Sequence, residues 1–331
     1  MGPSAAVAEV RHAVRTCLSD LSAGQLVLVA CSGGADSLAL AAALAFVAPR
    51  AGLHGGGVTV DHGLQAGSAE RAADLAALLG RLGLDPVIIV AVAVAQEAGP
   101  EAAARAARYE ALDRTAREHQ AAAVLLGHTL DDQAETVLLG LARGSGARSL
   151  AGMPERRDRY RRPLLGLRRA TTAAACAELG LQPWQDPHNR DISRFARARV
   201  RHQALPALED ALGPGVAEAL ARTARQLRAD AECLDDLAFA ESGQLREPCS
   251  DPAGLDAQRL AALPAAIRTR VLRDAAIMAG CPPGALAAEH VERIDALVTG
   301  WRGQRWVDLP GRVRARRRDG QVWFTSAGPA S

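Results

Sequence analysis

Residues 25–37 read QLVLVACSGGADS, and this stretch decides the fold. The run Gln25–Cys31 is almost wholly apolar and predicts a buried strand. A helix is expected over Ser37–Ala48. The two glycines between them let the backbone approach an anion closely, and the free N–H groups at a helix start attract negative charge. The stretch therefore predicts a phosphate-binding loop between a strand and a helix.

The same alternation of strands and helices continues to about residue 143. Further strands are expected at Gly57–Asp61, Pro86–Val92 and Ala123–Gly127, with helices at Ser68–Leu82, Glu101–His119 and Asp131–Arg143. This alternation is typical of an α/β fold with a parallel sheet and helices on both faces. Such sheets bind ligands at the carboxyl ends of their strands.

The rest of the chain is expected to be mostly helical and to include a smaller second domain. The turn Gly213–Gly215 is the best boundary, giving domains 1–212 and 213–331. Ahead of it, helices are expected at Arg169–Leu179 and Arg194–Leu205. Beyond it, helices are expected at Val216–Glu241, Pro264–Ala279 and Ala285–Val298, and a hairpin at Arg305–Thr325.

The composition is that of a globular protein, with 49% hydrophobic and 23% charged residues. No apolar run reaches the eighteen or so residues that a membrane helix needs, and charge appears too early for a signal peptide. We therefore expect a cytoplasmic protein without membrane attachment. The six cysteines form no CxxC pair, which favours free thiols over a zinc or redox site.

All 39 basic residues are arginine, and the chain contains no lysine. This excludes a Walker A loop and any mechanism that uses an enzyme lysine as nucleophile. Residues 1–150 hold 11 arginines against 15 acids, whereas residues 151–331 hold 28 against 22. The excess lies in runs at Arg156–Arg169, Arg190–Arg201 and Arg312–Arg318, which suit a polyanionic partner such as RNA or, equally well, an ordinary solvated surface.

The strongest local motif is the loop after the first strand. Its residues, expected to bind the nucleotide, are Ser32, Gly33, Gly34, Ala35, Asp36 and Ser37. Asp36 would repel phosphate on its own, so it fits best as a ligand of a bridging Mg²⁺. The alternative is a plain turn in which serine and aspartate cap the helix.

Two further clusters follow strand ends. Asp61 and His62 end the second strand and could contact a base or ribose, although such a pair often marks only a turn. His128 precedes Asp132 and Glu135, which share one helix face with Asp131 close by. These groups suit Mg²⁺, an ammonium group or proton transfer; helix capping is the alternative.

Several motifs together resemble one family. In order, they are SGGADS, VDHGL, ARAARY, LGHTLDDQAET, RGSGARSLAGM, RPLL and WQDPHN, over about residues 25–210. The first alone indicates only PP-loop ATP pyrophosphatases, but the whole series resembles tRNA(Ile)-lysidine synthases. The resemblance implies that ATP adenylates C2 of the wobble cytidine in the CAU anticodon of tRNA(Ile), and that free L-lysine then displaces AMP to give lysidine.

The resemblance also implies roles for individual residues. Asp36 and Asp132 match metal positions, and Glu135 matches an acid near the lysine amine. His128 and Arg108 match positions near the reacting base and its phosphate. Either Asp132 or Glu135 is expected to accept the amine proton. ATP and Mg²⁺ are the cofactors implied, and the sequence leaves a homodimer open.

The sequence departs from the family pattern at Gln65, His188 and Ala198, which puts exact tRNA contacts in doubt. Trp184 is expected to be mainly a core residue. The motifs leave three other functions as alternatives: a tRNA-thiolating PP-loop enzyme, a PP-loop amidotransferase-type synthetase, and a non-catalytic nucleotide- or RNA-binding protein. The first lacks a cysteine pair, the second lacks a glutaminase-like Cys/His arrangement, and the acid cluster argues against the third.

Overall fold

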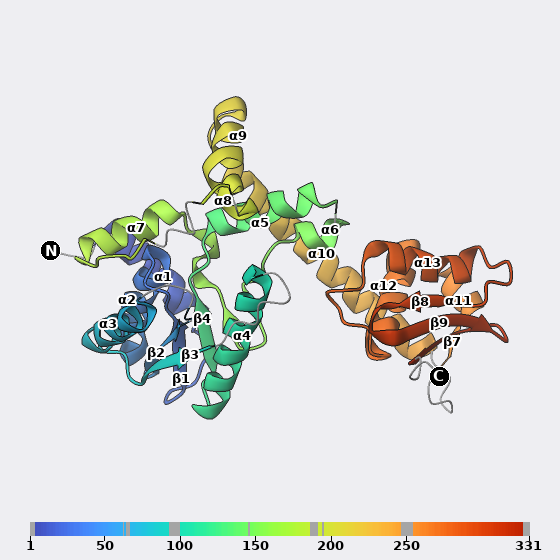
Figure 1. Ribbon diagram of the computed structural model, residues 1–331, viewed down its shortest axis with the longest axis horizontal. Coiled ribbons are helices and arrows are strands. Elements are labelled where there is room, and N and C mark those ends of the chain that lie inside the picture. The colour runs from blue at the N-terminus through green and yellow to red at the C-terminus, as the bar shows by residue number, and fades with distance from the viewer. Residues whose placement is uncertain are drawn as a thin grey trace. The chain divides into compact units, whose positions relative to one another are not determined.

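The computed structural model describes residues 4–61, 63, 67–92, 100–144, 146–185, 191–193, 195–245 and 254–326. The chain forms two compact units (Figure 1). The first contains residues 1–142 and 152–224, and the second contains residues 143–151 and 225–331. The division therefore falls inside the long helix α10 (Val216–Leu245), whereas the sequence suggested a boundary just before it.

The first unit is built on a six-stranded sheet. Its order is β3-β2-β1-β4-β6-β5, and all neighbours are parallel except β5 and β6. The strands are β1 (Leu26–Ala30), β2 (His54–Asp61), β3 (Val87–Ala91), β4 (Ala123–Leu126), β5 (Arg156–Arg157) and β6 (Tyr160–Arg161). The α/β prediction is confirmed, but the short strands β5 and β6 were not predicted.

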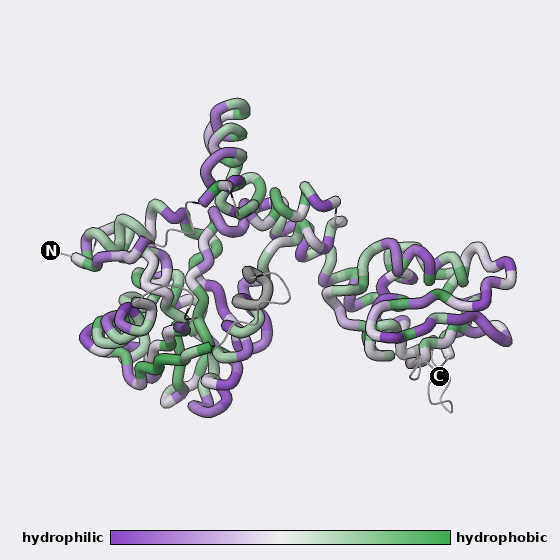
Figure 2. The backbone as a smooth tube through the Cα atoms, viewed as in Figure 1, coloured by the Kyte–Doolittle hydropathy of each residue, from purple (hydrophilic) through white to green (hydrophobic). Residues whose placement is uncertain are grey.

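The central strands are apolar on both faces because helices cover both. Val27 and Val29 of β1 pack into a core with α1 (Ala5–Cys17), α2 (Ala35–Arg50), α3 (Ser68–Arg81) and α7 (Arg169–Glu178). Leu28 and Ala30 face the opposite core, to which α4 (Pro100–Glu118) contributes Leu112. Figure 2 shows these inner strands as the hydrophobic centre of the unit.

Strand β2 begins at His54, three residues before its predicted start. The added part contains glycines, which allow neighbouring groups to pack closely against the strand. A Cβ at Gly56 would lie 2.7 Å from the Pro86 carbonyl oxygen, and one at Gly57 would lie 2.8 Å from Leu79 Cδ1. Glycine is disfavoured in strands by propensity alone. The pattern therefore could not reveal a strand that depends on tertiary contact.

A helical segment follows the sheet. It comprises α8 (Ala196–Arg199), the π-helical turn η3 (Val200–Ala204) and α9 (Leu205–Leu212). The predicted end at Leu205 was wrong, because Pro206 occupies the first turn of α9, where no N–H is required. Leu205 packs with Leu130 of α5 (Leu130–Ala142) and Ala217 of α10. This small core holds the segment against α5, which carries the predicted acids.

The second unit combines helices with an antiparallel sheet in the order β7-β10-β9-β8. Its elements, besides the end of α10, are α6 (Gly146–Leu150), β7 (Leu255–Asp256), α11 (Ala257–Ala262), α12 (Ala265–Met278), α13 (Ala288–Thr299), β8 (Val307–Leu309), β9 (Val313–Arg318) and β10 (Gln321–Ser326). The predicted hairpin is confirmed: Asp319 and Gly320 both have positive φ, as its tight turn requires.

The nine-residue segment that contains α6 packs within the second unit, although its chain neighbours lie in the first. Arg148 Nη2 contacts Asp235 Oδ2 of α10 at 2.5 Å. Arg228 Nη2 donates to the Ala151 carbonyl oxygen at 2.7 Å. In the described part of the chain, no helix has both the length and the apolar character needed to cross a membrane.

Candidate active site

The phosphate loop, Ser32–Ser37, connects β1 to α2 and is folded around a buried hydroxyl. Gly33 has φ +83°, a left-handed conformation that glycine adopts without strain. Ser37 Oγ donates to the Gly34 carbonyl at 2.9 Å and accepts from Ser32 N at 3.2 Å. Ser37 therefore braces the loop from inside, while Gly34 forms the N-cap of α2.

Gly127 brings the end of β4 against this loop. A Cβ there would lie 3.1 Å from the Ser37 nitrogen and 3.2 Å from the Asp36 carbonyl oxygen. His128 and α5 follow directly, so they start beside the loop. Gly127 was not among the predicted site residues. A glycine at the end of a buried strand could have indicated this close approach of two backbones.

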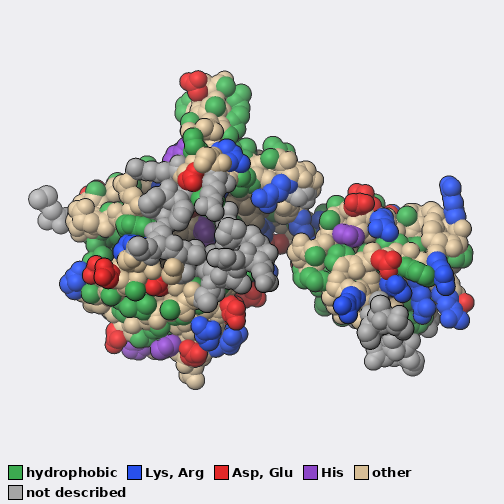
Figure 3. All heavy atoms as spheres, in the orientation of Figure 1, with side chains coloured by type: hydrophobic (Ala, Val, Ile, Leu, Met, Phe, Trp, Pro, Cys, Tyr) green, Lys and Arg blue, Asp and Glu red, His purple; other side chains and the backbone are tan. Residues whose placement is uncertain are grey.

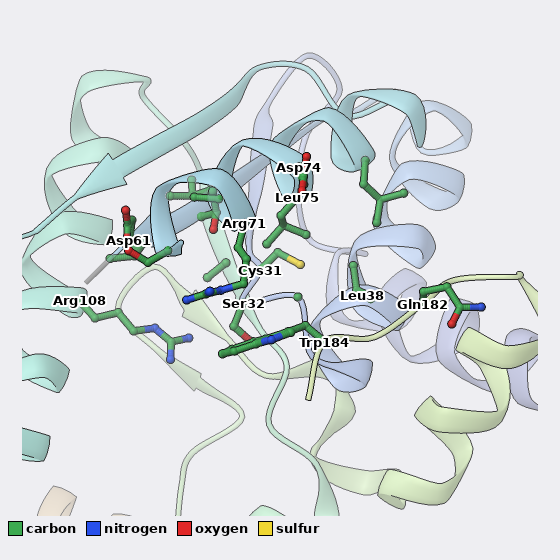
Figure 4. A pocket seen from close by; sticks show the side chains of 18 of the residues that line it. Cys31, Ser32, Leu38, Asp61, Arg71, Asp74, Leu75, Arg108, Gln182 and Trp184 are labelled. Carbon is green, nitrogen blue, oxygen red and sulfur yellow. The ribbon is translucent and has the colours of Figure 1, made fainter. Parts of the chain in front are cut away.

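A cavity of about 630 Å³ lies beside the loop, over the ends of β1 and β2 (Figure 4). Its lining includes Cys31, Ser32, Asp61, Arg71, Arg108 and Trp184. This volume lies within the usual range for small-molecule sites. Asp61 Oδ1 accepts from Gly63 N at 2.9 Å, which fixes the turn after β2. His62, the other predicted contact there, lies outside the described residues.

The predicted acids at the start of α5 are buried. Glu135 has no exposed surface, and Asp132 is 7% exposed. Asp132 Oδ2 accepts from Thr129 N at 2.8 Å and from Thr129 Oγ1 at 3.0 Å. The Oδ2 oxygen of Asp132 therefore caps α5, which is the capping role given as the alternative. Its Oδ1 oxygen remains for other partners.

Three arginines surround these acids and form with them an acid–arginine cluster (Asp132, Glu135, Arg169, Arg197, Arg201). Asp132 Oδ1 lies 3.0–3.2 Å from a guanidinium nitrogen of each arginine. Glu135 contacts the same three at 3.2, 2.8 and 2.7 Å. A fully buried carboxylate is costly unless it is paired, and this cluster supplies the compensating charge.

Arg169 connects the cluster to the phosphate loop. Its Nε lies 3.6 Å from Asp36 Oδ2, while its Nη2 contacts Asp132 and Glu135. Thr172 Oγ1 donates to Asp36 Oδ1. The three carboxylates that sequence analysis assigned to metal and amine chemistry are thus gathered around one side chain.

The environment shifts the pKa values of these groups in different directions. Burial raises the pKa of Asp36, although Thr172 and Arg169 oppose this. Burial also acts to raise the pKa of Asp132, but Arg169 and Arg197 outweigh it and leave the pKa lowered. His128 is affected most: burial, aided by nearby arginines, lowers its pKa to about 3. Its imidazole is therefore neutral at physiological pH.

Two buried side-chain atoms of the first unit have unused bonding capacity. Among the described residues, His128 Nδ1 and Arg162 Nε are buried atoms without a hydrogen-bond partner. Arg108 points from α4 into the cavity (Figure 4), and burial lowers its pKa. No acid forms an ion pair with Arg108 in the part of the chain that the structure describes. An arginine in the cavity and a neutral histidine near the loop together suit an anionic ligand.

Comparisons with known proteins agree with this geometry. A family profile described as a PP-loop domain matches residues 7–208, and another, described as a TilS substrate binding domain, matches residues 255–323. The tRNA(Ile)-lysidine synthase of Thermobifida fusca is 64% identical over 321 residues, which cover 97% of this chain and 98% of that protein. That of Streptomyces coelicolor is 54% identical over 351 residues, covering 97% and 99%.

The chain belongs to the tRNA(Ile)-lysidine synthase family. The resemblance drawn from the motifs is confirmed, and this member is accordingly a ligase with an ATP-binding PP-loop domain. Among solved structures, the U34-tRNA thiolase NcsA from Methanococcus maripaludis, with its [4Fe-4S] cluster, matches with a TM-score of 0.56 at 20% identity. The match covers 67% of this chain and 79% of that one. This likeness concerns the fold alone.

Several sequence interpretations need correction in this family member. Trp184 is not a core residue: it is 38% exposed and lines the cavity. Ala198, one of the departures that put tRNA contacts in doubt, is only 5% exposed. The cysteines form no CxxC pair, but Cys176 reaches the phosphate loop from a distant part of the sequence and donates to the Ala35 carbonyl at 3.2 Å. Sequence separation hid this approach.

The arginine runs were interpreted either as contacts for a polyanion or as solvated surface, but several of their residues do neither. Arg161 is buried and pairs with Asp20 at 2.6 Å, and Arg169, Arg197 and Arg201 belong to the acid–arginine cluster. The third run is exposed at alternate positions of β9, and basic side chains gather on this unit in Figure 3. These exposed residues are Arg314, Arg316 and Arg318 of β9, with Arg312 just before the strand.

Proposed function

We propose that this chain uses ATP to join free lysine to C2 of the wobble cytidine of tRNA(Ile) with a CAU anticodon, through an adenylated intermediate. The single observation that carries the proposal is the convergence around Arg169. It places the phosphate loop and the two acids of α5 at one edge of the sheet. Family membership supports the reaction class, and this geometry supports an anion site next to carboxylates.

The phosphate loop and Asp36 would hold the triphosphate. Backbone N–H groups at the start of α2 would face an anion bound at the loop, and the helix dipole favours negative charge there. Asp36 and Asp132 would hold Mg²⁺ together with phosphate oxygens, the mixed donor set that this ion prefers. When bound, the ion would neutralise the departing pyrophosphate. Among the described residues no group of three or more potential ligands forms a closed metal site. The two carboxylates fit this shared mode, because both already face the one cation, Arg169.

The acid–arginine cluster would receive the lysine side chain. Asp132 and Glu135 are arranged around guanidinium groups, so the same oxygens can accept hydrogen bonds from an ammonium group. The amine must lose a proton before it attacks, and one of these two carboxylates is the acceptor in this proposal. His128, being neutral, could donate to or accept from the cytosine ring without adding charge.

Arg108 would stabilise negative charge near the reacting base, since it enters the cavity without a carboxylate partner among the described residues. The exposed arginines of β9 would contact tRNA phosphates. A cytoplasmic location follows from the need for both tRNA and free lysine.

The proposal is tested by incubating the full chain with ATP, Mg²⁺, radiolabelled lysine and bulk tRNA. Label should enter the anticodon loop and should survive the mild alkali that hydrolyses aminoacyl esters. Because the chain has no lysine of its own, the protein cannot contribute a lysine ε-amine, and the label can come only from the added free lysine. Absence of alkali-stable label with ATP still consumed would contradict the proposal.

A further inference from the structure

The indole of Trp184 stands next to the phosphate loop. Trp184 N donates to the Gly33 carbonyl oxygen at 2.9 Å, which ties the segment after α7 to the loop. Its Cβ lies 3.8 Å from the place that a Cβ on Gly33 would occupy. The backbone thus delivers the ring to the edge of the site where phosphates are expected.

The ring faces the cavity and not the protein core. The side chain of Arg71, from α3, lies over it, with the guanidinium carbon 5.0 Å from the ring centroid. Figure 4 shows the two side chains facing each other at the cavity. The lining nearby includes Ala30, Val58 and Leu75. An exposed aromatic ring beside these apolar side chains offers a flat surface to a planar ligand.

We propose that Trp184 is the stacking surface for the adenine base of the ATP whose phosphates bind the loop, and that Arg71 is a positioning residue that holds the indole. This inference rests on the nucleotide site proposed above. Stacking is the interaction that an uncharged ring offers to a base, whereas phosphates require charge or N–H groups. ATP is favoured over a tRNA base because the same cavity is lined by both Trp184 and the loop residues Ser32 and Gly33.

Binding of ATP and of inorganic pyrophosphate to the full chain, measured by calorimetry, separates base from phosphate recognition. Trp184→Ala should raise the Kd for ATP about tenfold or more, the usual effect of removing one base–aromatic stack. The Kd for pyrophosphate should stay unchanged, because the backbone bond to Gly33 survives the substitution. Trp184→Phe keeps an aromatic face and should bind ATP nearly as the parent chain does.

Trp301→Ala is the matched control. Trp301 is 47% exposed and has Arg317 at 5.2 Å from its ring, but it belongs to the second unit. Its removal should leave ATP affinity unchanged. The other three tryptophans, Trp301, Trp306 and Trp323, all belong to the second unit. An ATP-dependent change in tryptophan fluorescence should therefore disappear in Trp184→Phe.

The role of Arg71 is tested by a double-mutant cycle. Arg71→Ala should weaken ATP binding in the parent chain but have no further effect in Trp184→Ala, because it acts through the ring. Additive effects, or weaker pyrophosphate binding in Arg71→Ala, would show that Arg71 contacts the nucleotide itself and would overturn the positioning role.

Several results would overturn the stacking role. ATP affinity unchanged in Trp184→Ala would leave the ring without a function in nucleotide binding. An equal loss of ATP and pyrophosphate affinity would show that the substitution damages the loop. If the parent chain bound no ATP, the nucleotide site of the proposed function would fail as well. If Asp36→Ala weakened ATP binding and Trp184→Ala did not, the stacking role would be wrong while the proposed nucleotide site would stand.

Discussion

At the scale of single residues, the site depends on charges whose partners lie far away in the sequence. The motif LGHTLDDQAET correctly indicated a cluster of acids, because acidic residues at spacing three share a helix face. The sequence could not show that Arg169, Arg197 and Arg201 would neutralise these acids. Such pairing depends on tertiary folding, and an arginine in a basic run looks the same whether it faces solvent or a buried carboxylate.

Replacing Asp36 by alanine should abolish tRNA-dependent exchange between ATP and pyrophosphate. The reason is that Asp36 is the carboxylate of the phosphate loop and the proposed ligand of Mg²⁺. The fold should survive, because Arg169 keeps two other acidic partners. Exchange assays and thermal unfolding measure the two effects, and Glu118→Ala, at an exposed helix end, is the control. Retained turnover in Asp36→Ala would show that the metal site is assigned wrongly.

The pKa of His128 predicts a stability change with pH. The unfolded imidazole titrates near its ordinary value of 6.5, but the folded one has a pKa of about 3. Below pH 6.5 the unfolded state therefore binds the extra proton, and the free energy of unfolding falls as pH decreases. Between pH 7 and pH 5 this one group should cost about 2 kcal/mol.

Urea unfolding of the parent chain and of His128→Gln at both pH values isolates this contribution. The parent chain should lose more stability on acidification than the variant. Equal losses would mean that His128 is solvated or protonated in the folded protein.

At the scale of secondary structure, the elements with a strong local pattern were the ones predicted. Apolar runs revealed β1 and β4, and the Asp319–Gly320 turn revealed the hairpin. The elements that were missed or cut short depend on distant contacts. In β2, Leu28, Leu79 and Pro86 can approach the strand so closely only because glycines stand there. Strands β5 and β6 are two residues each and exist only because β4 offers a free edge.

The attachment of the α8–η3 segment to α5 should depend on the acid–arginine cluster. Arg201→Ala removes two contacts to fully buried Glu135 and should lower the free energy of unfolding by about 1.5–3 kcal/mol. Arg199→Ala, an exposed neighbour on the same segment, should change it by no more than about 0.5 kcal/mol. Chemical denaturation compares the two. Equal small effects would mean that the cluster contributes no net stability.

At the scale of the whole molecule, the net charge of +2 hides an uneven distribution. Several arginines of the second half neutralise acids inside the first unit, and others are exposed on β9 of the second unit. The sequence predicted the excess of arginine but could not separate these two uses. The exposed arginines of β9 are available to RNA without breaking a contact to a buried acid.

Binding of tRNA should therefore respond strongly to salt. If six or more phosphates are contacted, raising the salt concentration from 50 to 200 mM should weaken binding by about 10³-fold or more. Replacing Arg314, Arg316 and Arg318 by alanine should make the dependence shallower, because fewer counterions are released. Filter binding over a salt series measures both slopes. A flat response of the parent chain would remove the case for RNA contact by these residues.

The nine residues 143–151 have a consequence for protein engineering. They fold with the second unit through Arg148 and Ala151, yet they are inserted between two parts of the first. A chimera that exchanges only the portion after residue 224 between relatives would leave this insert against a foreign helix. A successful exchange must transfer two separate stretches of sequence together, so recombination at a single crossover cannot move the second unit intact.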